Sequence, residues 1–361
     1  MWYHVYMTSL LIYGANGYTG SLIAREAARR GLEPVLGARN AEGVSALARE
    51  LGLATRVFDL DNPIVVDRNL RDVSVVLHCA GPFARTFQPM ADACLRTKVH
   101  YLDITGEENV FETLAGRDGE AKTAGIMLLP GVGFDVVPTD CLAAHLKKRL
   151  PAATHLALAI KSSSRMSRGT ALTVIEGMHT GGLVRHEGVL KKVPAAWKTR
   201  PIDFGRGPAK AITIPWGDVA SAYYSTGIPN IEVYMEAPFG VRTAVRLSRF
   251  LGWALASRPV QAYLKNRVRA GSPGPTDEER ARGKSYFWGE VTDGAGNKAE
   301  AHLQGPESYT LTVLTALAVV ERVLAGHAPA GYQTPSTAYG PDFVLGVKGV
   351  TREDRTAGIM R

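Results

Sequence analysis

The chain has 361 residues, of which 45% are hydrophobic and 21% charged, a mixture typical of a globular protein. At about 150 residues per domain, this length predicts two domains. No apolar run reaches about 18 residues, which excludes a membrane-spanning helix. The formal net charge of +8 comes largely from residues 241–270, which hold arginines and lysines and no acidic residue. Because this charge is local, we do not expect a nucleic-acid-binding surface.

Cysteine and histidine usage bears on the compartment and on metals. Cys79, Cys94 and Cys141 are isolated from one another and lie in apolar contexts, so we expect reduced thiols in a cytoplasmic protein. No cluster of His, Cys and Asp has metal-ligand spacing, and we therefore predict no metal site. Residues 1–6 lack the features of a secretory signal, and we expect them to be an extension outside the fold.

The first third of the chain alternates short apolar segments with helical patterns. The apolar segments predict strands at residues 9–13, 34–38, 55–58, 73–79, 99–103 and 126–129. Helical patterns lie between them, at residues 19–31, 43–51, 87–98 and 110–124. Strands that alternate with helices of this length indicate βαβ units. We therefore predict an α/β fold with a parallel sheet for this part of the chain.

After Pro130 the pattern changes. Helices are predicted at residues 136–150 and 307–326, and strands at 155–161, 231–236, 285–291 and 298–303. Because these strands do not alternate regularly with helices, we expect an α+β domain on a mostly antiparallel sheet. The stretch 270–283, rich in Gly, Pro and charge, is predicted to be a loop.

A glycine-rich turn joins the first predicted strand to the first predicted helix. Gly14 would make the tight turn, Gly17 would let the backbone approach a pyrophosphate, and Gly20 would permit close helix–strand packing. The strand–turn–helix context makes these glycines informative, and it predicts a Rossmann-type dinucleotide site with phosphates at the helix N-terminus. The cofactor-binding residues expected in this turn are Gly14, Asn16, Gly17, Tyr18, Thr19 and Gly20.

The second predicted strand is followed by Arg39, at a place where NAD-binding domains usually have an acidic residue. A guanidinium there can bond a 2′-phosphate through two N–H groups, so we predict NADP(H) rather than NAD(H). Asp59, after the third strand, is expected beside the adenine. Ligands bind beyond the carboxyl ends of parallel strands, so the loop after the fourth strand should line the nicotinamide ribose. Its residues are Ala80, Gly81, Pro82 and Phe83.

Several segments together resemble the saccharopine dehydrogenase-like oxidoreductases. They are the glycine turn and residues 78–83, 101–107, 133–138, 167–170, 225–230 and 331–343. The resemblance runs from about residue 9 to residue 345. It implies an NADP-binding Rossmann domain (residues 1–132) and an inserted α+β substrate domain (133–304). A C-terminal helix and tail (305–361) would return to the Rossmann domain.

Within this family, the sequence is most similar in character to the bacterial trans-acting enoyl reductases. The resemblance implies an NADPH-dependent reductase that reduces a C=C bond of a hydrophobic or acyl substrate. Two alternatives stay open: reduction of a C=N bond in an amino-acid-derived substrate of the saccharopine type, and NADP binding without turnover in a sensor or scaffold. A substrate with several carboxylates would require arginines, for which the candidates are Arg165, Arg168 and Arg185.

Reduction of a double bond also requires a proton donor. Tyr309 begins the long C-terminal helix, Asp103 and Glu107 follow the fifth predicted strand, and Asp135 follows the sixth. Each of these catalytic candidates has a structural alternative, which is core packing for the tyrosine and helix capping for the acids. The sequence leaves both roles open.

The basic segment, residues 241–269, has a pattern of its own. Leu247, Phe250, Leu251, Ala254 and Leu255 recur at helical spacing on one face, and arginines flank that face. Such a helix suits a lipid-like substrate or a peripheral contact with an anionic membrane, with an ordinary surface helix as the alternative. A homodimer is compatible with the sequence, although no particular segment indicates one.

Overall fold

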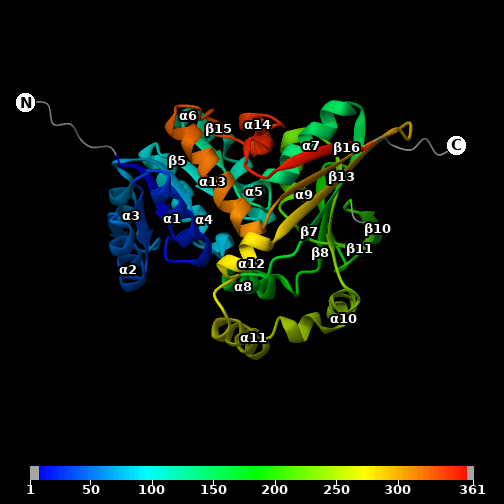
Figure 1. Cartoon of the computed structure of the whole chain (residues 1–361), viewed down its shortest axis with the longest axis horizontal. Helices are drawn as coiled ribbons and strands as arrows, with labels where there is room; N and C mark the ends of the chain where they lie inside the picture. Colours follow the sequence, from blue (N-terminus) through cyan, green and yellow to red (C-terminus); the bar gives the residue numbers. More distant parts are fainter. Residues whose placement is uncertain (1–7, 206, 356–361) are drawn as a thin grey trace, which may run out of the picture. The chain divides into compact units, whose positions relative to one another are not determined.

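The computed structural model of the chain describes residues 8–205 and 207–355, so the expected N-terminal extension lies outside the described residues. The chain divides into two compact units. The first comprises the residues up to Phe134 together with Leu311–Thr334, and the second comprises Asp135–Thr310 together with the residues from Pro335 onward. Figure 1 shows the path of the chain through its helices and strands by colour.

The first unit is built on a sheet that has seven strands over the described residues, and every neighbouring pair is parallel. The order is β15-β6-β5-β4-β1-β2-β3, so the direction of winding reverses between β1 and β4. This doubly wound order is that of a Rossmann-type fold, which confirms the predicted fold class. The strands are β1 (Thr8–Tyr13), β2 (Val35–Ala38), β3 (Thr55–Val57), β4 (Val73–His78), β5 (His100–Asp103), β6 (Met127–Leu129) and β15 (Gly331–Tyr332).

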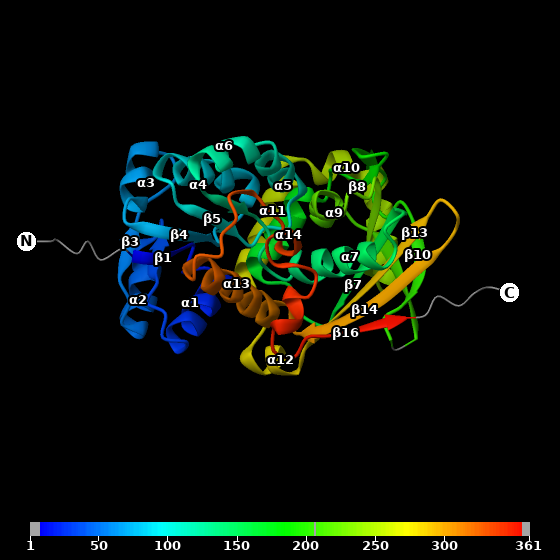
Figure 2. The same ribbon diagram turned by 90° about the horizontal axis from the view of Figure 1, so that it is seen from above.

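Helices connect these strands, as the alternating pattern predicts (Figure 2). They are α1 (Tyr18–Arg29), α2 (Ala41–Leu51), α3 (Pro63–Leu70), α4 (Phe83–Thr97), α5 (Glu108–Ala115) and α6 (Asp118–Ala124). Two differences from the sequence prediction stand out. The single helix predicted over residues 110–124 is two helices, separated at Gly116 and Arg117, and α3 was not predicted. The Asn62 side chain caps α3 by accepting hydrogen bonds from the Ile64 and Val65 amides.

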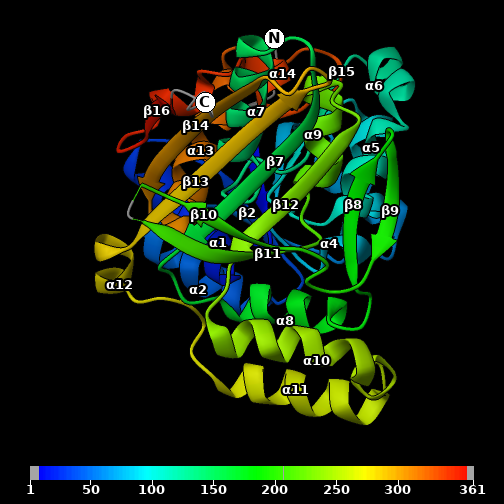
Figure 3. The ribbon, with the colours of Figure 1, turned by 90° about the vertical axis from the view of Figure 1, so that its right-hand side faces the viewer.

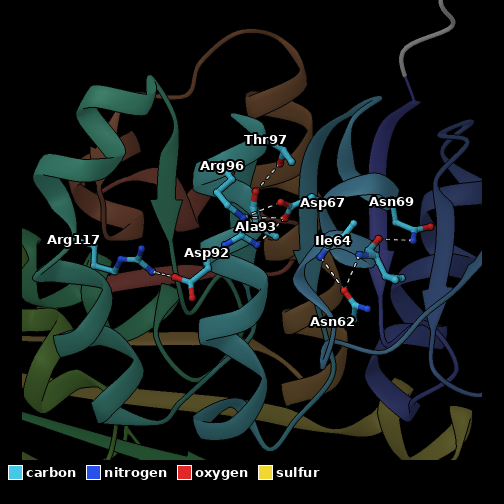
Figure 4. Close-up of polar contacts among 10 residues, drawn as sticks. Asn62, Ile64, Asp67, Asn69, Asp92, Ala93, Arg96, Thr97 and Arg117 are labelled. Atoms are coloured by element: carbon cyan, nitrogen blue, oxygen red, sulfur yellow. Dashed lines mark hydrogen bonds and ion pairs between the residues drawn. The ribbon is translucent and has the colours of Figure 1, made fainter.

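The central strands carry the core of the first unit. Leu11, Leu36, Val75 and Leu77 are fully buried, as expected for a parallel sheet covered by helices on both faces. On the outside, ion pairs join the helices to one another (Figure 4). Arg96 of α4 binds the Asp67 carboxylate of α3 at 2.7 Å, while Arg117 pairs with Asp92.

The second unit is built on a sheet of nine strands over the described residues. Its order is β10-β11-β12-β7-β13-β14-β16, and β8 pairs with both β12 and β9 (Figure 3). Over the described residues every strand pair of this sheet is antiparallel except β7 with β12, so the expected antiparallel character is confirmed. The strands are β7 (Ala153–Ser162), β8 (Gly182–His186), β9 (Val189–Val193), β10 (Thr199–Asp203), β11 (Pro208–Thr213), β12 (Asn230–Glu236), β13 (Lys284–Asp293), β14 (Lys298–Pro306) and β16 (Thr351–Arg355).

The stretch predicted to be a loop at residues 270–283 contains a short helix, so that prediction was wrong. The Thr276 side chain accepts a hydrogen bond from the Glu279 amide, and the Glu279 carboxylate accepts one from the Thr276 amide. This reciprocal cap supplies partners for amides that a short helix leaves bare. The helices of this unit are α7 (Val137–Arg149), α8 (Arg168–Gly177), α9 (Asp218–Thr226), α10 (Phe239–Leu255), α11 (Arg258–Ala270), α12 (Asp277–Arg282), α14 (Pro335–Tyr339) and η1 (Phe343–Gly346).

The chain passes back into the first unit within α13 (Ser308–Leu324). It then adds β15 to the parallel sheet, with Gly331 opposite Met127. The tail does not remain there, because β16 pairs with β14 of the second unit. The division at residues 132/133 and 304/305 stays a prediction. The compact units differ from it in assigning the residues after Thr334 to the second unit.

Candidate cofactor site

The turn between β1 and α1 can be made only by glycines at two positions. Gly14 has φ +85°, and a Cβ there would lie 2.7 Å from the Ala80 nitrogen. A Cβ on Gly20 would collide with the carbonyl oxygen of Gly14. The sequence-based roles of these two residues, a tight turn and close packing, therefore have a steric basis.

The N-terminus of α1 carries the positive potential of a helix start. Gly17 is the N-cap residue, no side chain caps the helix, and its first turn contains no acidic residue. The first amides of a helix lack intrahelical acceptors, and the helix dipole adds to their attraction for an anion. Asn16 and Gly17 are exposed, and Tyr18 and Thr19 are half-buried. A phosphate group fits this end of α1 by charge and by hydrogen-bonding capacity.

Strand register brings the other predicted cofactor residues to the same edge of the sheet. Tyr13 lies opposite Gly37 of β2 and opposite His78 of β4. The Gly14 amide donates to the Gly37 carbonyl at 2.7 Å, and the Cys79 amide donates to the Tyr13 carbonyl at 2.7 Å. The chain segments that follow β1, β2 and β4 therefore lie next to one another at the point where the winding reverses. Ligands of doubly wound sheets bind at such a point.

Arg39 follows β2 at this edge. Its side chain is exposed and makes no hydrogen bond or ion pair with any residue in 8–205 or 207–355. Burial raises the pKa of the Tyr13 phenol to about 12, while nearby Arg39 lowers this pKa and Asp59 raises it, so both charges lie close to that phenol. The Asp59 carboxylate is exposed and accepts a hydrogen bond from the Asp61 amide at 3.2 Å. An unpaired guanidinium in this position suits a 2′-phosphate.

The loop at Ala80–Phe83 is held by Thr86 and His78, neither of which was among the predicted site residues. The Thr86 hydroxyl donates to the Ala80 carbonyl at 2.6 Å and lies 2.9 Å from Nε2 of His78. His78 is fully buried and its ring stacks on Tyr13, and burial lowers its pKa to about 3. The imidazole is therefore neutral and structural. A polar residue ending an otherwise apolar strand was the available signal.

Asp103 and Glu107 both act on the backbone of the first unit. The buried Asp103 carboxylate accepts hydrogen bonds from the Thr105 and Gly131 amides, each at 2.9 Å, and from the Tyr101 hydroxyl at 2.7 Å. Burial is the main cause that raises its pKa to about 6. These bonds join the end of β5 to the chain after β6.

Glu107 does not cap the helix that follows it. Its carboxylate accepts the Phe83 amide at 2.9 Å and the Ala84 amide at 2.8 Å, and it therefore caps α4. Phe83, one of the residues predicted to line the cofactor, is held in place by this contact. The geometry favours positioning roles for both Asp103 and Glu107, and their proposed catalytic roles stay predictions.

The other two catalytic candidates belong to the second unit. The Tyr309 phenol is buried, accepts the Ser167 amide at 2.5 Å and lies 3.2 Å from the Thr170 hydroxyl, so it fixes the start of α8. Asp135 is half-buried, and its carboxylate makes no hydrogen bond or ion pair with the described residues. It does not cap α7, whose N-cap is Val136. Burial raises the pKa of Asp135 to about 7.

The three arginines considered for substrate carboxylates have different local partners. Arg165 pairs with Glu279 at 3.0 Å, and Arg168 donates to the Gly271 carbonyl at 2.8 Å. Arg185 is buried and donates to the Val219 and Gly188 carbonyls. No contact joins the three guanidinium groups to one another within the described part of the chain.

Comparisons with known proteins agree with this geometry. Residues 10–129 match the family described as the saccharopine dehydrogenase NADP binding domain. The human saccharopine dehydrogenase-like oxidoreductase is 26% identical over 221 residues, which cover 54% of this chain and 46% of that protein. The trans-acting enoyl reductase of Mycobacterium ulcerans (strain Agy99) is 27% identical over 267 residues, covering 68% of this chain and 62% of that protein. The chain thus spans about half of the length of the first of these relatives.

Solved structures share the fold at lower sequence identity. Saccharopine dehydrogenase (L-Glu forming) from Saccharomyces cerevisiae has a TM-score of 0.66 and 11% identity, with 97% of this chain and 100% of that chain covered. Homospermidine synthase from Legionella pneumophila, solved in complex with NAD, has a TM-score of 0.65 and 10% identity, with 98% and 93% covered. The predicted resemblance and cofactor class are confirmed. Residues 10–129 are thus similar to the saccharopine dehydrogenase NADP binding domain, and the chain is similar to the saccharopine dehydrogenase-like oxidoreductases and the trans-acting enoyl reductases.

Proposed function

We propose that the protein is an NADPH-dependent reductase that reduces a C=C bond conjugated to the carbonyl group of a hydrophobic acyl substrate. The uncapped start of α1 beside the unpaired Arg39 is the observation that carries the cofactor part of this proposal. NADPH, when bound, supplies the hydride. The chain itself must bind the phosphates, orient the nicotinamide end and provide one proton.

Different residues of the first unit would bind the phosphates and hold the loop after β4. The α1 amides after Gly17 would bind the pyrophosphate, and Arg39 would bind the 2′-phosphate. Glu107 holds the Phe83 and Ala84 amides, so the loop after β4 is set before the cofactor arrives. Such preorganisation avoids an ordering cost on binding.

Asp135 is the proton donor that we propose. Of the four predicted acids, it alone has a side chain without a hydrogen bond or ion pair among the described residues. Its pKa of about 7 leaves part of the population protonated at neutral pH, which suits a general acid. Tyr309, Asp103 and Glu107 would then position the backbone around them.

Two observations favour a C=C substrate over a C=N substrate with several carboxylates. Arg165, Arg168 and Arg185 each bind a group of the protein and do not form a shared anion site. The match to the trans-acting enoyl reductase also covers more of this chain than the match to the saccharopine dehydrogenase-like protein. That this chain acts on the same class of substrate as that relative is part of our proposal.

The first test measures NADPH oxidation by the full chain against two substrate panels. One holds enoyl thioesters of increasing chain length, and the other pairs amines with 2-oxo acids or aldehydes. We expect turnover with the enoyl panel alone. Turnover only with the amine pairs would move the protein to imine reduction. Tight NADPH binding without turnover in either panel would support the sensor or scaffold alternative instead.

Substitution Asp135→Asn tests the proton donor. We expect kcat to fall by about 100-fold or more, as for loss of a general acid, and the decline of kcat above about pH 7 to disappear. Folding gives an independent readout. The folded pKa of about 7 exceeds the ordinary value of 3.8, so the wild type loses stability as pH rises through this window. The variant lacks that loss and should melt at a higher temperature than the wild type at about pH 8.

The matched control is Asp277→Asn, which changes an exposed carboxylate of α12 in the same unit. It should leave kcat and its pH dependence unchanged. If Asp135→Asn were as active as this control at about pH 8, Asp135 would not be the proton donor.

A further inference from the structure

The helices α10 and α11 form a hairpin (residues 239–270) with an unusual surface. Neither helix contains a single buried residue. Figure 3 shows the two helices side by side below α8. Helices of a globular protein normally bury an apolar face, because that burial provides most of their stability. This hairpin therefore raises the question of what covers its apolar side chains.

Few contacts attach the hairpin to the second unit. Gln261 donates to the Ile175 carbonyl at 3.0 Å, and Lys265 pairs with Glu176 at 2.7 Å, so α11 is fastened to α8. On α10, Arg249 donates to the Ala195 and Ala196 carbonyls. Val245 packs against the small cluster that contains Ala196. These contacts account for the inner side of the hairpin.

The outer side of α10 exposes large apolar residues, which we call the aromatic stripe. The exposed fractions are 76% for Phe239, 54% for Leu247, 77% for Phe250, 50% for Leu251 and 79% for Trp253. The sequence predicted one helix face of Leu247, Phe250, Leu251, Ala254 and Leu255; the first three are exposed to solvent, whereas Ala254 and Leu255 are half-buried. Single exposed apolar residues are ordinary, whereas a row of them marks an interaction surface.

The same hairpin carries positive charge that the protein leaves uncompensated. Residues 241–270 contain no acidic residue. Of their basic side chains, Lys265 alone forms an ion pair among the residues that the structure describes. The contacts of Arg246 and Arg249 are to neutral acceptors, the Thr199 hydroxyl and two carbonyl groups, which do not cancel their charge. The basic set is Arg242, Arg246, Arg249, Arg258, Lys265, Arg267 and Arg269.

We propose that the hairpin docks the protein onto the surface of an anionic phospholipid bilayer. The aromatic stripe would enter the boundary between headgroups and acyl chains, where amphipathic helices with Trp, Phe and Leu bind. The exposed Arg267 and Arg269 of the basic set would face the phosphates. Charge complementarity selects this occupant, because one sign of charge surrounds the stripe. Leu247 and Leu251 are suited to acyl chains rather than to the stacked bases of a nucleic acid. Over the described residues no helix is long and apolar enough to span a membrane, so the contact is at the surface.

Vesicle co-sedimentation of the full chain tests the proposal. The probes are phosphatidylcholine vesicles with and without phosphatidylglycerol at about one lipid in three. We expect the wild type to sediment with the anionic vesicles. The double variant Phe250→Ser with Trp253→Ser should bind at least 10-fold more weakly. Each substitution should lower the equilibrium constant for transfer of the side chain from water into the bilayer by roughly 10-fold or more. Because both side chains are exposed, the melting temperature should not fall.

The control for apolar exposure is Ile64→Ser in α3, whose side chain is also 77% exposed and should not affect vesicle binding. For the charges, Arg267→Gln should weaken binding to anionic vesicles by about five-fold at low salt, and Arg49→Gln on α2 should not. This proposal does not depend on the proposed reductase activity, and NADPH oxidation by the hairpin variants should be preserved without vesicles.

Two results would overturn it. Failure of the wild type to bind anionic vesicles, together with a mass by light scattering that falls from dimer to monomer in the double variant, would make the stripe an interface between copies of this chain. Binding of an oligonucleotide by the wild type, lost in Arg267→Gln and without any vesicle binding, would make the hairpin a nucleic-acid surface.

Discussion

Two helices of the first unit begin at the same edge of the sheet, and the protein treats their N-termini differently. Helix α1 follows β1 and starts after Gly17, with no capping side chain and no acid in its first turn. Helix α4 follows the neighbouring strand β4, and the Phe83 and Ala84 amides at its start are bound by the Glu107 carboxylate. Both ends attract anions. The difference shows that such an end is available to a cofactor only where the chain does not supply the anion itself.

The largest effect should come from closing the space at α1. In Gly20→Ala the new Cβ meets the Gly14 carbonyl oxygen, so the phosphate turn must move. We expect a loss of stability of about 1–3 kcal/mol from overpacking and NADPH affinity at least 10-fold weaker. Urea denaturation and fluorescence titration with NADPH measure the two quantities.

Gly119→Ala provides the comparison, because it lies in helix α6 with nothing within 4 Å of the new Cβ. That variant should be as stable as the wild type or slightly more so, since alanine favours a helix over glycine. Equal behaviour of the two alanine variants would remove the steric argument for Gly20.

The next largest effect is expected on NADPH affinity when the proposed partner of the 2′-phosphate is removed. Arg39→Ala removes an exposed guanidinium that makes no ion pair with the described residues, so the fold should be unaffected. NADPH affinity should fall by roughly 10- to 100-fold, since hydrogen bonds to charged groups contribute about 1.5–3 kcal/mol. NADH affinity should hardly change. Isothermal titration of both cofactors measures this, with Arg49→Ala as the surface control. An equal loss for NADH and NADPH would show that Arg39 does not bind the 2′-phosphate.

The smallest effect is expected at α4. Glu107→Gln keeps an oxygen acceptor but removes the negative charge at the helix N-terminus, so the unfolding free energy should fall by about 1 kcal/mol. NADPH affinity should change less than in Gly20→Ala or Arg39→Ala, because the carboxylate acts through Phe83. Glu33→Gln, which changes an exposed carboxylate outside any helix of the same unit, is the control. A large loss of kcat with unchanged stability would instead favour the catalytic role of Glu107.

The elements of the first unit were predictable because each is specified locally. The apolar strand segments were assigned to within about two residues, since a parallel sheet buries both faces of every central strand. The short helices α3 and α12 were missed. Each begins at a capping residue, Asn62 or Thr276, but is too short to show a helical period.

The residues of the candidate site also fall into a group that the sequence predicted and a group that it missed. The glycines of the turn after β1, Arg39 and the loop after β4 were predicted from their position relative to a strand, and their contacts with the cofactor stay predictions. Glu107 binds backbone amides that it reaches only after folding, from 24 residues away in the case of Phe83. Such contacts cannot be predicted from the spacing of residues along the sequence.

By itself, the sequence determined the parallel sheet and the glycine turn, because local periodicity and glycine sterics decide them. The charge of Arg39 at the end of a strand predicted NADP, and its contact with the 2′-phosphate stays a prediction. Only the tertiary structure decided which polar groups are already bound. It engaged Glu107 in capping α4, left the Asp135 carboxylate without a hydrogen bond or ion pair among the described residues, and turned the apolar face of α10 toward solvent. The physical reason is that hydrogen bonding and burial depend on neighbours distant in the chain, and these same two quantities set the pKa of Asp135 and the accessibility of the aromatic stripe.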